Sequence, residues 1–239
     1  MNARQRLLSA DAFGDRPCLY FDEQTFTYAE IYARAARYAA ELSKQGIRAG
    51  DRVAVVSGST PDLVVALAGH HHAGVVHVPI NTRYQAAEVQ HILTDCRPSL
   101  VLTDDAHAAL VASAAPEMRV QKIGSASPLG TEGAPVSPAA RIDGRDPALM
   151  IYTSGTTAKS KGVVLSYEAI VANMEALTSL WGWSAADELV LALPLFHVHG
   201  LCIGVYGSML HGMPMRLLPA FDPTQVVEGV EAGGTIFMG

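Results

Sequence analysis

Apolar and polar residues recur along this chain with two periods, one helical and one typical of buried strands. Apolar side chains return at every third or fourth position over 27–47, which predicts a helix. A β-branched run over 51–58 predicts a buried strand. Pro61 and Gly74 are typical of the first position and the C-terminal stop of the helix that follows. The chain therefore opens with a helix, a strand and another helix.

The same alternation continues through the rest of the chain and predicts the fold class. Repeated alternation of strands and helices favours mostly parallel sheets covered by helices. We therefore expect an α/β fold of layered, mostly parallel sheets flanked by helices. The further strands are expected over 75–79, 99–104, 118–123, 147–155, 188–195, 214–219 and 234–239, and the further helices over 85–96, 105–114, 167–183, 198–212 and 223–231.

One segment interrupts this alternation. Residues 124–145 are rich in Ser, Gly, Pro and Ala and show no periodicity, which is typical of a surface connection. The sequence thus predicts a first α/β subdomain over 1–123 and a second over 146–239. We expect the second to be incomplete at its C-terminus, because the chain stops inside an expected strand.

Composition narrows the class of protein. Of 239 residues, 49% are hydrophobic and 17% are charged, which is typical of a globular protein. The net charge of −6 argues against a cationic surface for nucleic acid. Cys18, Cys96 and Cys202 are far apart and form no CxxC pair. We therefore expect a reducing compartment, the cytoplasm, and no disulfide framework.

A long uncharged stretch raises the alternative of a membrane span. Residues 189–215 contain no Asp, Glu, Lys or Arg, and the stretch is long enough to cross a bilayer. Pro194, three histidines and several glycines interrupt it, so a strand, a loop and a helix fit it better. We expect no transmembrane segment.

Residues 152–162, YTSGTTAKSKG, carry the most distinctive chemistry. A Walker A loop has the spacing G-x-x-x-x-G-K-[ST]. Counted from Gly155, Lys161 falls on the lysine position. Ser160 and Gly162, however, occupy the positions of the second glycine and of the magnesium-binding hydroxyl. The motif is therefore not a Walker A loop.

The residue types of this motif still suit a polyphosphate. Gly155 lets successive backbone N–H groups point at one anion, and the neighbouring Ser and Thr hydroxyls are further donors. Lys159 and Lys161 supply positive charge. Because the motif follows an expected strand, it should lie at the carboxyl edge of a sheet, where ligands bind in open α/β folds. A flexible polar turn without a ligand is the plain alternative.

The stretch YTSGTTAKSKGVVLS resembles the phosphate-binding signature of the AMP-forming acyl-CoA synthetases, which belong to the adenylate-forming superfamily. Two positions depart from it, since Ala158 and Ser160 stand where the family usually has Gly and Pro. The resemblance implies the N-terminal part of the large domain of such an enzyme. Other stretches that resemble this family are FTYAEIYARAARYAAEL, GDRVAVVSGSTPDLVVALAGHHHAGVVHVPIN, LPLFHVHGL and GGTIFMG.

The resemblance implies ATP-dependent activation of a small-molecule carboxylic acid. A carboxylate oxygen attacks the α-phosphorus of ATP, which gives an acyl-adenylate and pyrophosphate, and the thiol of coenzyme A then displaces AMP. Mg²⁺ is the implied metal, with the hydroxyl of Thr156 near it. The residues implied to hold the β- and γ-phosphates are Thr153, Ser154, Gly155, Thr156, Thr157, Lys159 and Lys161.

The histidines divide into two groups. His197, in PLFHVHG, matches a family position where the carboxylate meets the α-phosphate, so the resemblance implies a catalytic role. An ordinary loop histidine is the alternative, and His199 is expected to be structural. The consecutive His70, His71 and His72 have no partner at i+4 on their helix, so we expect no metal site there.

The sequence says less about which carboxylic acid is the substrate. We expect a fatty acid or another small carboxylic acid, with a malonate-like acid as a further option. The small residues Gly204, Gly207 and Ser208 are candidates for lining an acyl tunnel. A dicarboxylate needs a buried cation, and Arg216 is the one Arg after residue 145. Arg83 and Glu88 are expected to be solvated surface charges rather than substrate contacts.

The family's remaining parts have no match in this chain. The adenine-binding segment, a magnesium-binding Glu, a ribose-binding Asp and a catalytic Lys lie beyond residue 239 in the family pattern. We therefore expect an N-terminal portion that is inactive alone, with a complementary C-terminal portion as its partner. A non-catalytic module that binds nucleotide or pyrophosphate stays open as an alternative, and a phosphate-loop NTPase is the third.

Overall fold

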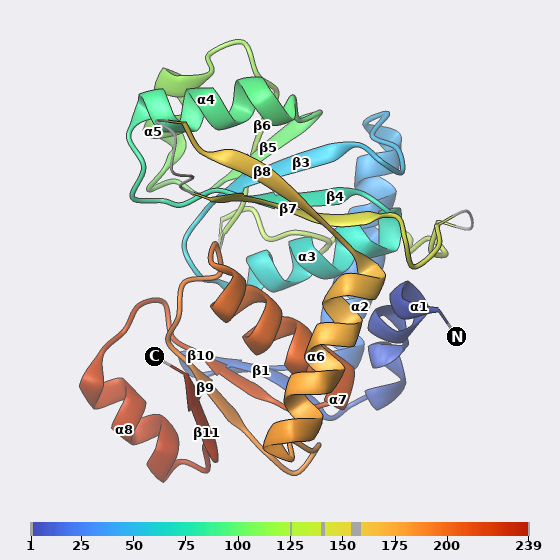
Figure 1. Ribbon diagram of the computed structural model, residues 1–239, viewed down its shortest axis with the longest axis vertical. Helices are drawn as coiled ribbons and strands as arrows, with labels where there is room; N and C mark the ends of the chain where they lie inside the picture. Colours follow the sequence, from blue (N-terminus) through green and yellow to red (C-terminus); the bar gives the residue numbers. More distant parts are fainter. Residues whose placement is uncertain (1, 125, 140–141, 154–158, 239) are drawn as a thin grey trace.

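The computed structural model describes residues 2–124, 126–139, 142–153 and 159–238. Within these ranges the strands form two sheets, with helices between and outside them (Figure 1). One sheet has the strand order β6-β5-β3-β4-β7-β8 and the other the order β11-β9-β10-β1-β2. Among the described strands, β2 and β8 run antiparallel to their neighbours and the others pair parallel. The expected α/β class is confirmed.

The elements alternate along the chain much as the apolar pattern predicts. The strands are β1 (Pro17–Phe21), β2 (Gln24–Thr27), β3 (Arg52–Val56), β4 (Val76–Pro79), β5 (Leu100–Thr103), β6 (Val120–Lys122), β7 (Pro147–Thr153), β8 (Lys161–Ser166), β9 (Leu189–Leu191), β10 (Met215–Leu217) and β11 (Ile236–Met238). The helices are α1 (Ala3–Leu8), the 3₁₀-helix η1 (Ser9–Phe13), α2 (Tyr28–Lys44), α3 (Pro61–Ala73), α4 (Ala86–Cys96), α5 (Ala108–Ala114), α6 (Tyr167–Trp181), the π-helix η2 (His199–Tyr206), α7 (Gly207–His211) and α8 (Pro223–Glu231).

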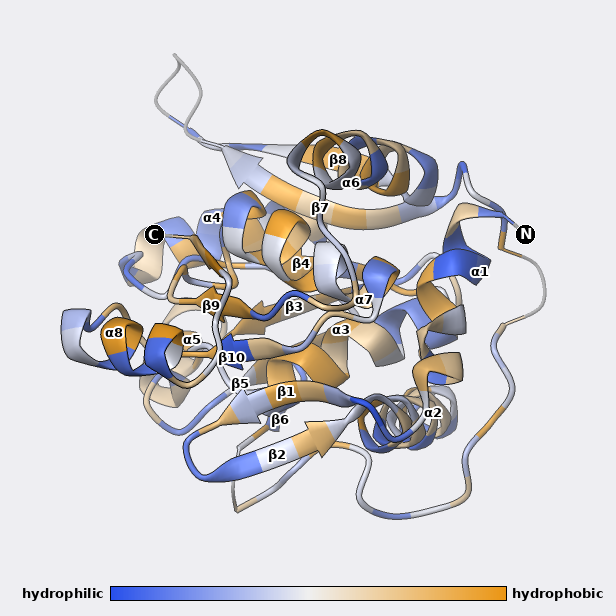
Figure 2. Ribbon diagram, turned by 90° about the horizontal axis from the view of Figure 1, so that it is seen from below, coloured by the Kyte–Doolittle hydropathy of each residue, from blue (hydrophilic) through white to orange (hydrophobic). Residues whose placement is uncertain are grey.

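The hydrophobic core occupies the spaces between successive layers. On β3, Val53 and Val55 face the main core between the two sheets, which α2, α3, α6 and η2 fill. Ala54 and Val56 point to the opposite face and pack beneath α4 and α5. The helix α8 covers the far side of the second sheet. Figure 2 shows hydrophobic residues along β1, β7 and β9, in keeping with strands that are covered by other layers.

The two sheets take strands from both parts of the chain. β7 and β8 join the sheet that begins with β3, and β1 and β2 join the sheet that contains β9, β10 and β11. The segment 124–145 thus connects two stretches of chain that each contribute strands to both sheets. The division into subdomains over 1–123 and 146–239 stays a prediction.

Some local features differ in detail from the expectations, or were not expected. The hairpin of β1 and β2 and the strand β8 lay outside the expected elements, although both pair with buried strands. The helix expected over 198–212 begins as the π-helix η2, in a segment where Gly204 and Gly207 approach neighbouring side chains closely. The strand expected over 188–195 is confined to β9, because Pro194 cannot donate to a ladder.

The uncharged stretch over 189–215 is divided between β9, η2, α7 and β10. Among the described residues, every helix is too short or too polar to cross a bilayer.

Candidate functional site

The two ends of the phosphate motif face each other at the carboxyl edge of the six-stranded sheet. Thr153 is the last residue of β7, and it pairs with Lys161, the first residue of β8. Since β7 runs parallel to β4, this hairpin turns at the edge where the parallel strands end. Thr153, Lys159 and Lys161 are exposed there. The predicted ligands Ser154, Gly155, Thr156 and Thr157, with Ala158, lie outside the described residues.

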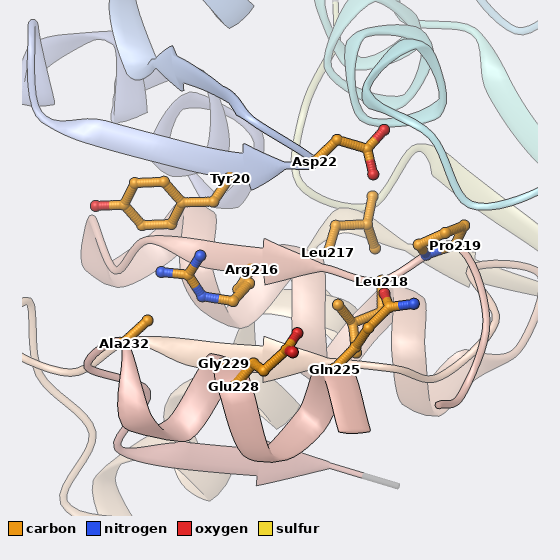
Figure 3. A pocket seen from close by; sticks show the side chains of 10 residues that line it. All are labelled: Tyr20, Asp22, Arg216, Leu217, Leu218, Pro219, Gln225, Glu228, Gly229 and Ala232. Carbon is orange, nitrogen blue, oxygen red and sulfur yellow. The ribbon is translucent and has the colours of Figure 1, made fainter. Parts of the chain in front are cut away.

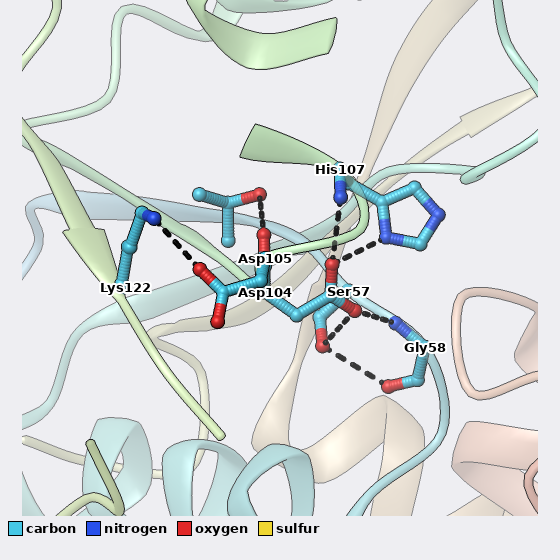
Figure 4. Close-up of polar contacts among 7 residues, drawn as sticks. Ser57, Gly58, Asp104, Asp105, His107 and Lys122 are labelled. Carbon is cyan, nitrogen blue, oxygen red and sulfur yellow. Dashed lines mark hydrogen bonds and ion pairs between the residues drawn. The ribbon is translucent and has the colours of Figure 1, made fainter. Parts of the chain in front are cut away.

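The neighbouring strands bring a polar cluster to the same edge (Figure 4). Asp104, directly after β5, accepts hydrogen bonds from the backbone N–H of Gly58 at 2.8 Å and from the hydroxyl of Ser57 at 3.2 Å. Its other oxygen lies 2.6 Å from Nδ1 of His107. Burial acts to raise the pKa of Asp104, but the hydrogen bonds from Gly58 and His107 outweigh burial and lower it. The carboxylate therefore stays charged and fixes the chain where β3 ends.

The segment that carries His197 is attached to the end of β3. The backbone N–H of Leu195 donates to the hydroxyl of Ser59 at 3.2 Å. Because β3 and β7 both neighbour β4, their ends lie two strand spacings apart, about 10 Å. The fold thus brings the segment before His197 to the same edge of the sheet as Thr153 and Lys161.

His197 itself is exposed just before the π-helix. Its backbone N–H donates to the carbonyl of Pro194 at 3.2 Å, and its carbonyl accepts from the N–H of Leu201 at 2.9 Å. Its ring lies 4.6 Å from the ring of Phe196, measured between centroids. His199, the first residue of η2, is exposed as well. An accessible imidazole at this position can donate to, or accept from, a ligand oxygen.

The candidate acyl-tunnel residues lie against the protein interior. A Cβ at Gly204 would lie 2.8 Å from Leu191, and one at Gly207 would lie 2.9 Å from Trp183. Ser208 is buried, and its carbonyl accepts from the hydroxyl of Tyr28 at 2.9 Å. Close packing of η2 and α7 therefore accounts for the two glycines.

Arg216 is already neutralised by a partner. Its guanidinium donates to Oε1 of Glu188 at 2.8 and 3.0 Å. It also lies 4.7 Å from the centroid of the Tyr20 ring. Arg216 and Tyr20 line a pocket of about 340 Å³ beside α8. Figure 3 shows the side chains that line it. A paired Arg on this side of the sheet does not match the unpaired cation that a dicarboxylate requires.

Two residues of the histidine triplet belong to the core. His70 and His71 are fully buried, and Nδ1 of His70 lies 2.8 Å from Nδ1 of His77. Across the described ranges, no group of His, Cys, Asp and Glu has the arrangement of a metal site. His72 instead uses Nε2 to contact the carbonyl of Val136 at 2.5 Å.

The two surface charges near α4 have local roles. Glu88 accepts from the backbone N–H of Gln85 at 2.9 Å, which completes a capping box at the start of α4. The backbone N–H of Arg83 donates to the side chain of Asn81 at 2.9 Å. Both contacts order the turn that leaves β4.

Sequence reasoning missed Ser57, Ser59 and Asp104, although a signal was present. Each lies within three residues of the end of a parallel strand, and such ends meet at one edge of the sheet. His91 and Asp95 were also missed, because nothing in the sequence relates these two helix residues to Ser160 and Tyr152, which follow them by 69 and 57 positions.

The described groups define what this edge can bind. A threonine hydroxyl and two lysines suit a ligand with several negative oxygens, since charge-assisted hydrogen bonds are stronger than neutral ones. The exposed His197 adds a donor or acceptor from the second sheet.

Comparison with known proteins agrees with this geometry. A family model described as AMP-binding enzyme matches residues 8–239. The chain is 31% identical to human mitochondrial malonate–CoA ligase ACSF3 over 91% of its own length and 39% of the relative. It is 34% identical to the long-chain-fatty-acid–CoA ligase FadD13 of Mycobacterium tuberculosis, over 84% of this chain and 41% of that one.

Solved structures give the same result for the fold. ATP-bound MatB from Rhodopseudomonas palustris superposes with a TM-score of 0.88 at 30% identity, over 100% of this chain and 49% of that chain. The chain therefore spans less than half the length of these relatives. With the family match extending from residue 8 to residue 239, the chain belongs to the AMP-binding enzyme family.

Proposed function

We propose that this chain contributes the phosphate-binding part of an enzyme that converts a carboxylic acid and ATP into an acyl-adenylate, and then into an acyl-CoA thioester. The observation that carries the proposal is the pairing of Thr153 with Lys161 at the carboxyl edge of the sheet. Family membership and the named CoA ligases among the relatives support the same reaction.

The first step needs positioning and charge stabilisation more than acid–base chemistry. A carboxylate oxygen forms a bond to the α-phosphorus of ATP, and the bond from that phosphorus to the bridging oxygen of pyrophosphate breaks. Lys159, Lys161 and the hydroxyl of Thr153 would bind the β- and γ-phosphates and stabilise the charge on departing pyrophosphate. Ser154, Gly155, Thr156 and Thr157 complete the proposed donor set.

His197 is the proposed catalytic residue on the opposite side. Its exposed imidazole would donate to an oxygen of the α-phosphate, near the incoming carboxylate, as negative charge builds up there. In the second step the thiol of coenzyme A forms the C–S bond and AMP leaves as the C–O bond breaks.

Mg²⁺ would be held mainly by the phosphates, with one hydroxyl of the motif as the proposed protein ligand. Since the described residues hold no metal-ligand cluster, the ion would bind phosphate oxygens and water, with the hydroxyl of Thr156 proposed as its protein ligand. When bound, it would neutralise part of the charge on the polyphosphate.

The proposed acid is a fatty acid or another small carboxylic acid. Named relatives act on malonate and on long-chain fatty acids, so both classes belong in a screen. Because Arg216 is paired with Glu188, we favour a monocarboxylate.

Pyrophosphate–ATP exchange tests the proposal. We expect no exchange by the 239-residue chain alone, and exchange with a panel of acids once the chain is joined to a complementary C-terminal portion from a relative. Exchange by the isolated chain would show that no complementary portion is needed.

A non-catalytic nucleotide- or pyrophosphate-binding module is the second candidate, because the exposed Thr153, Lys159 and Lys161 suit phosphate oxygens whether or not a reaction follows. Binding of ATP without exchange in every joined form would favour it.

A further inference from the structure

One helix, α4, contacts a residue near each end of the phosphate motif. The hydroxyl of Tyr152 donates to Oδ2 of Asp95 at 2.5 Å. Nε2 of His91 lies 2.9 Å from the carbonyl oxygen of Ser160. Because a carbonyl only accepts, Nε2 must carry the hydrogen in this contact. His91 and Asp95 are four residues apart and so share one face of α4.

The ring of Tyr152 is also fitted against the facing strand. Tyr152 pairs with Gly162 across the hairpin. A Cβ at position 162 would lie 3.1 Å from Cζ of Tyr152 and 3.2 Å from its oxygen, so glycine leaves room for the ring. Burial, and then the hydrogen bond to Asp95, raise the pKa of Tyr152, so the phenol stays protonated and donates.

These contacts fix residues that are adjacent to Thr153 and Lys161. Thr153 follows Tyr152, and Lys161 follows Ser160, so each proposed phosphate ligand is bonded to an anchored residue. Successive side chains on a strand point to opposite faces. Tyr152 packs on the α4 side, whereas Ile151 belongs to the core between the sheets. Thr153 therefore points to the side of Leu195, which belongs to that same core.

We propose that His91 and Tyr152 are positioning residues, which hold Lys161 and Thr153 where they bind the pyrophosphate part of ATP. This inference rests on the proposed function. Anchoring from α4 removes alternative positions of the two strand ends before the ligand arrives, and such preorganisation strengthens binding.

The test is binding of magnesium pyrophosphate to the 239-residue chain, measured by calorimetry. His91→Leu removes the donor to Ser160, and Tyr152→Phe removes the hydroxyl but keeps the ring. Each is expected to raise Kd about two- to tenfold, the effect of one hydrogen bond. His91→Gln, whose amide can donate to the same carbonyl, is expected to bind nearly as tightly as the wild type.

His72→Leu is the matched control. It also removes an imidazole contact to a backbone carbonyl, that of Val136, but it lies at the C-terminal end of α3, away from the motif. It is expected to leave Kd unchanged. If His91→Leu does not fold, Tyr152→Phe carries the test, since it keeps the ring and removes only the hydroxyl.

The outcomes separate the two proposals. Absence of binding by the wild type would overturn the proposed function and this inference together. Binding by the wild type with equal Kd in His91→Leu and Tyr152→Phe would overturn the inference alone. The same holds if His72→Leu weakens binding as much as His91→Leu, or if His91→Gln gives no recovery.

Discussion

The hydroxyl of Ser59 accepts a hydrogen bond of 3.2 Å from the backbone N–H of Leu195, across 136 residues of chain. Ser59 is buried at the end of β3, and Leu195 lies two residues before His197. A buried backbone donor needs a partner, so this contact secures the loop that leaves β9. The position of the proposed catalytic histidine thus depends on a residue from a distant part of the chain.

Replacing Ser59 tests this dependence. Ser59→Ala leaves the N–H of Leu195 without its acceptor, so the free energy of unfolding should fall by about 1–2 kcal/mol. The imidazole NMR signals of His197 should shift as the loop relaxes. Urea unfolding and imidazole spectra provide the two measurements. Ser179→Ala, on the exposed face of α6, should change neither, and unchanged His197 signals in Ser59→Ala would contradict the expectation.

The buried histidines predict acid instability. Burial, followed by repulsion from neighbouring cationic groups, lowers the pKa of His71 to about 3, and burial lowers that of His77 to about 3. Burial also holds the pKa of His70 well below its ordinary value. All three are neutral in the folded chain and take up protons on unfolding below about pH 6.5. Stability should therefore decrease as the pH falls from 6.5 towards 3.

The size of this effect follows from the linkage relation. At pH 5, each of the two histidines with a pKa of about 3 should cost about 2 kcal/mol relative to neutral pH. Unfolding in urea at several pH values measures it. His71 lies between the rings of Tyr167 and Tyr206, and neither of its nitrogens has a partner among the described residues. His71→Phe should therefore reduce the pH dependence, and the exposed His199→Phe should not.

The carboxylate of Asp62 binds the backbone at the start of the connection over 124–145. Asp62 forms an ion pair with Arg34 and accepts from the N–H of Gly124 at 2.9 Å and of Leu129 at 3.3 Å. Asp62→Ala leaves Arg34 unpaired in a half-buried place and should cost about 3 kcal/mol of stability. Limited proteolysis should then cut this connection faster than in the wild type.

The control for Asp62 is an ion pair on the surface. Asp105 pairs with Lys122 at 2.7 Å, and the two side chains are 74% and 61% exposed. Asp105→Ala should therefore cost less than about 1 kcal/mol. Equal stability losses in Asp62→Ala and Asp105→Ala would contradict the proposed role of burial.

Two glycines in the same connection allow the cost of backbone strain to be measured separately from the cost of a steric clash. Gly130 has φ of +63°, and a Cβ there would lie 1.9 Å from the carbonyl oxygen of Arg34. Gly133 has φ of +83°, but the nearest atom to its Cβ would be Nζ of Lys44 at 3.9 Å. Gly133→Ala should cost about 1 kcal/mol from strain alone. Gly130→Ala should cost more than about 2 kcal/mol, because the backbone must also move. Thermal unfolding distinguishes these costs, and similar values would argue against the clash.

Local signals predicted the helix ends well. Pro61 and Gly74 bound α3 as expected, and Thr27 and Glu30 form a capping box at the start of α2. These signals succeed because a cap or a left-handed residue acts within one turn of the chain. The strands β9 and β10 are present but shorter than expected. The hairpin of β1 and β2 was not predicted, and β1 gains its place in the sheet by pairing with β10, which is distant in sequence.

The candidate site divides in the same way. The motif over 152–162 stands out in the sequence because hydroxyls, glycine and lysines lie close together along the chain, whereas His197 was predicted from the resemblance alone, and both roles stay predictions. The anchoring of Tyr152 by Asp95 and of Ser160 by His91 could not be found, since these contacts exist only once α4 packs on the sheet.

The sequence by itself therefore determined the alternation of helices and strands and the two ends of α3, and it predicted polyphosphate chemistry for one motif. The tertiary structure alone decided that β7 lies beside β4, that β1 lies beside β10, and that Ser59 meets Leu195. The physical reason is the distance along the chain over which each interaction acts. Propensity and capping act over a few residues, whereas strand order and buried contacts depend on which apolar faces cover one another across the whole chain.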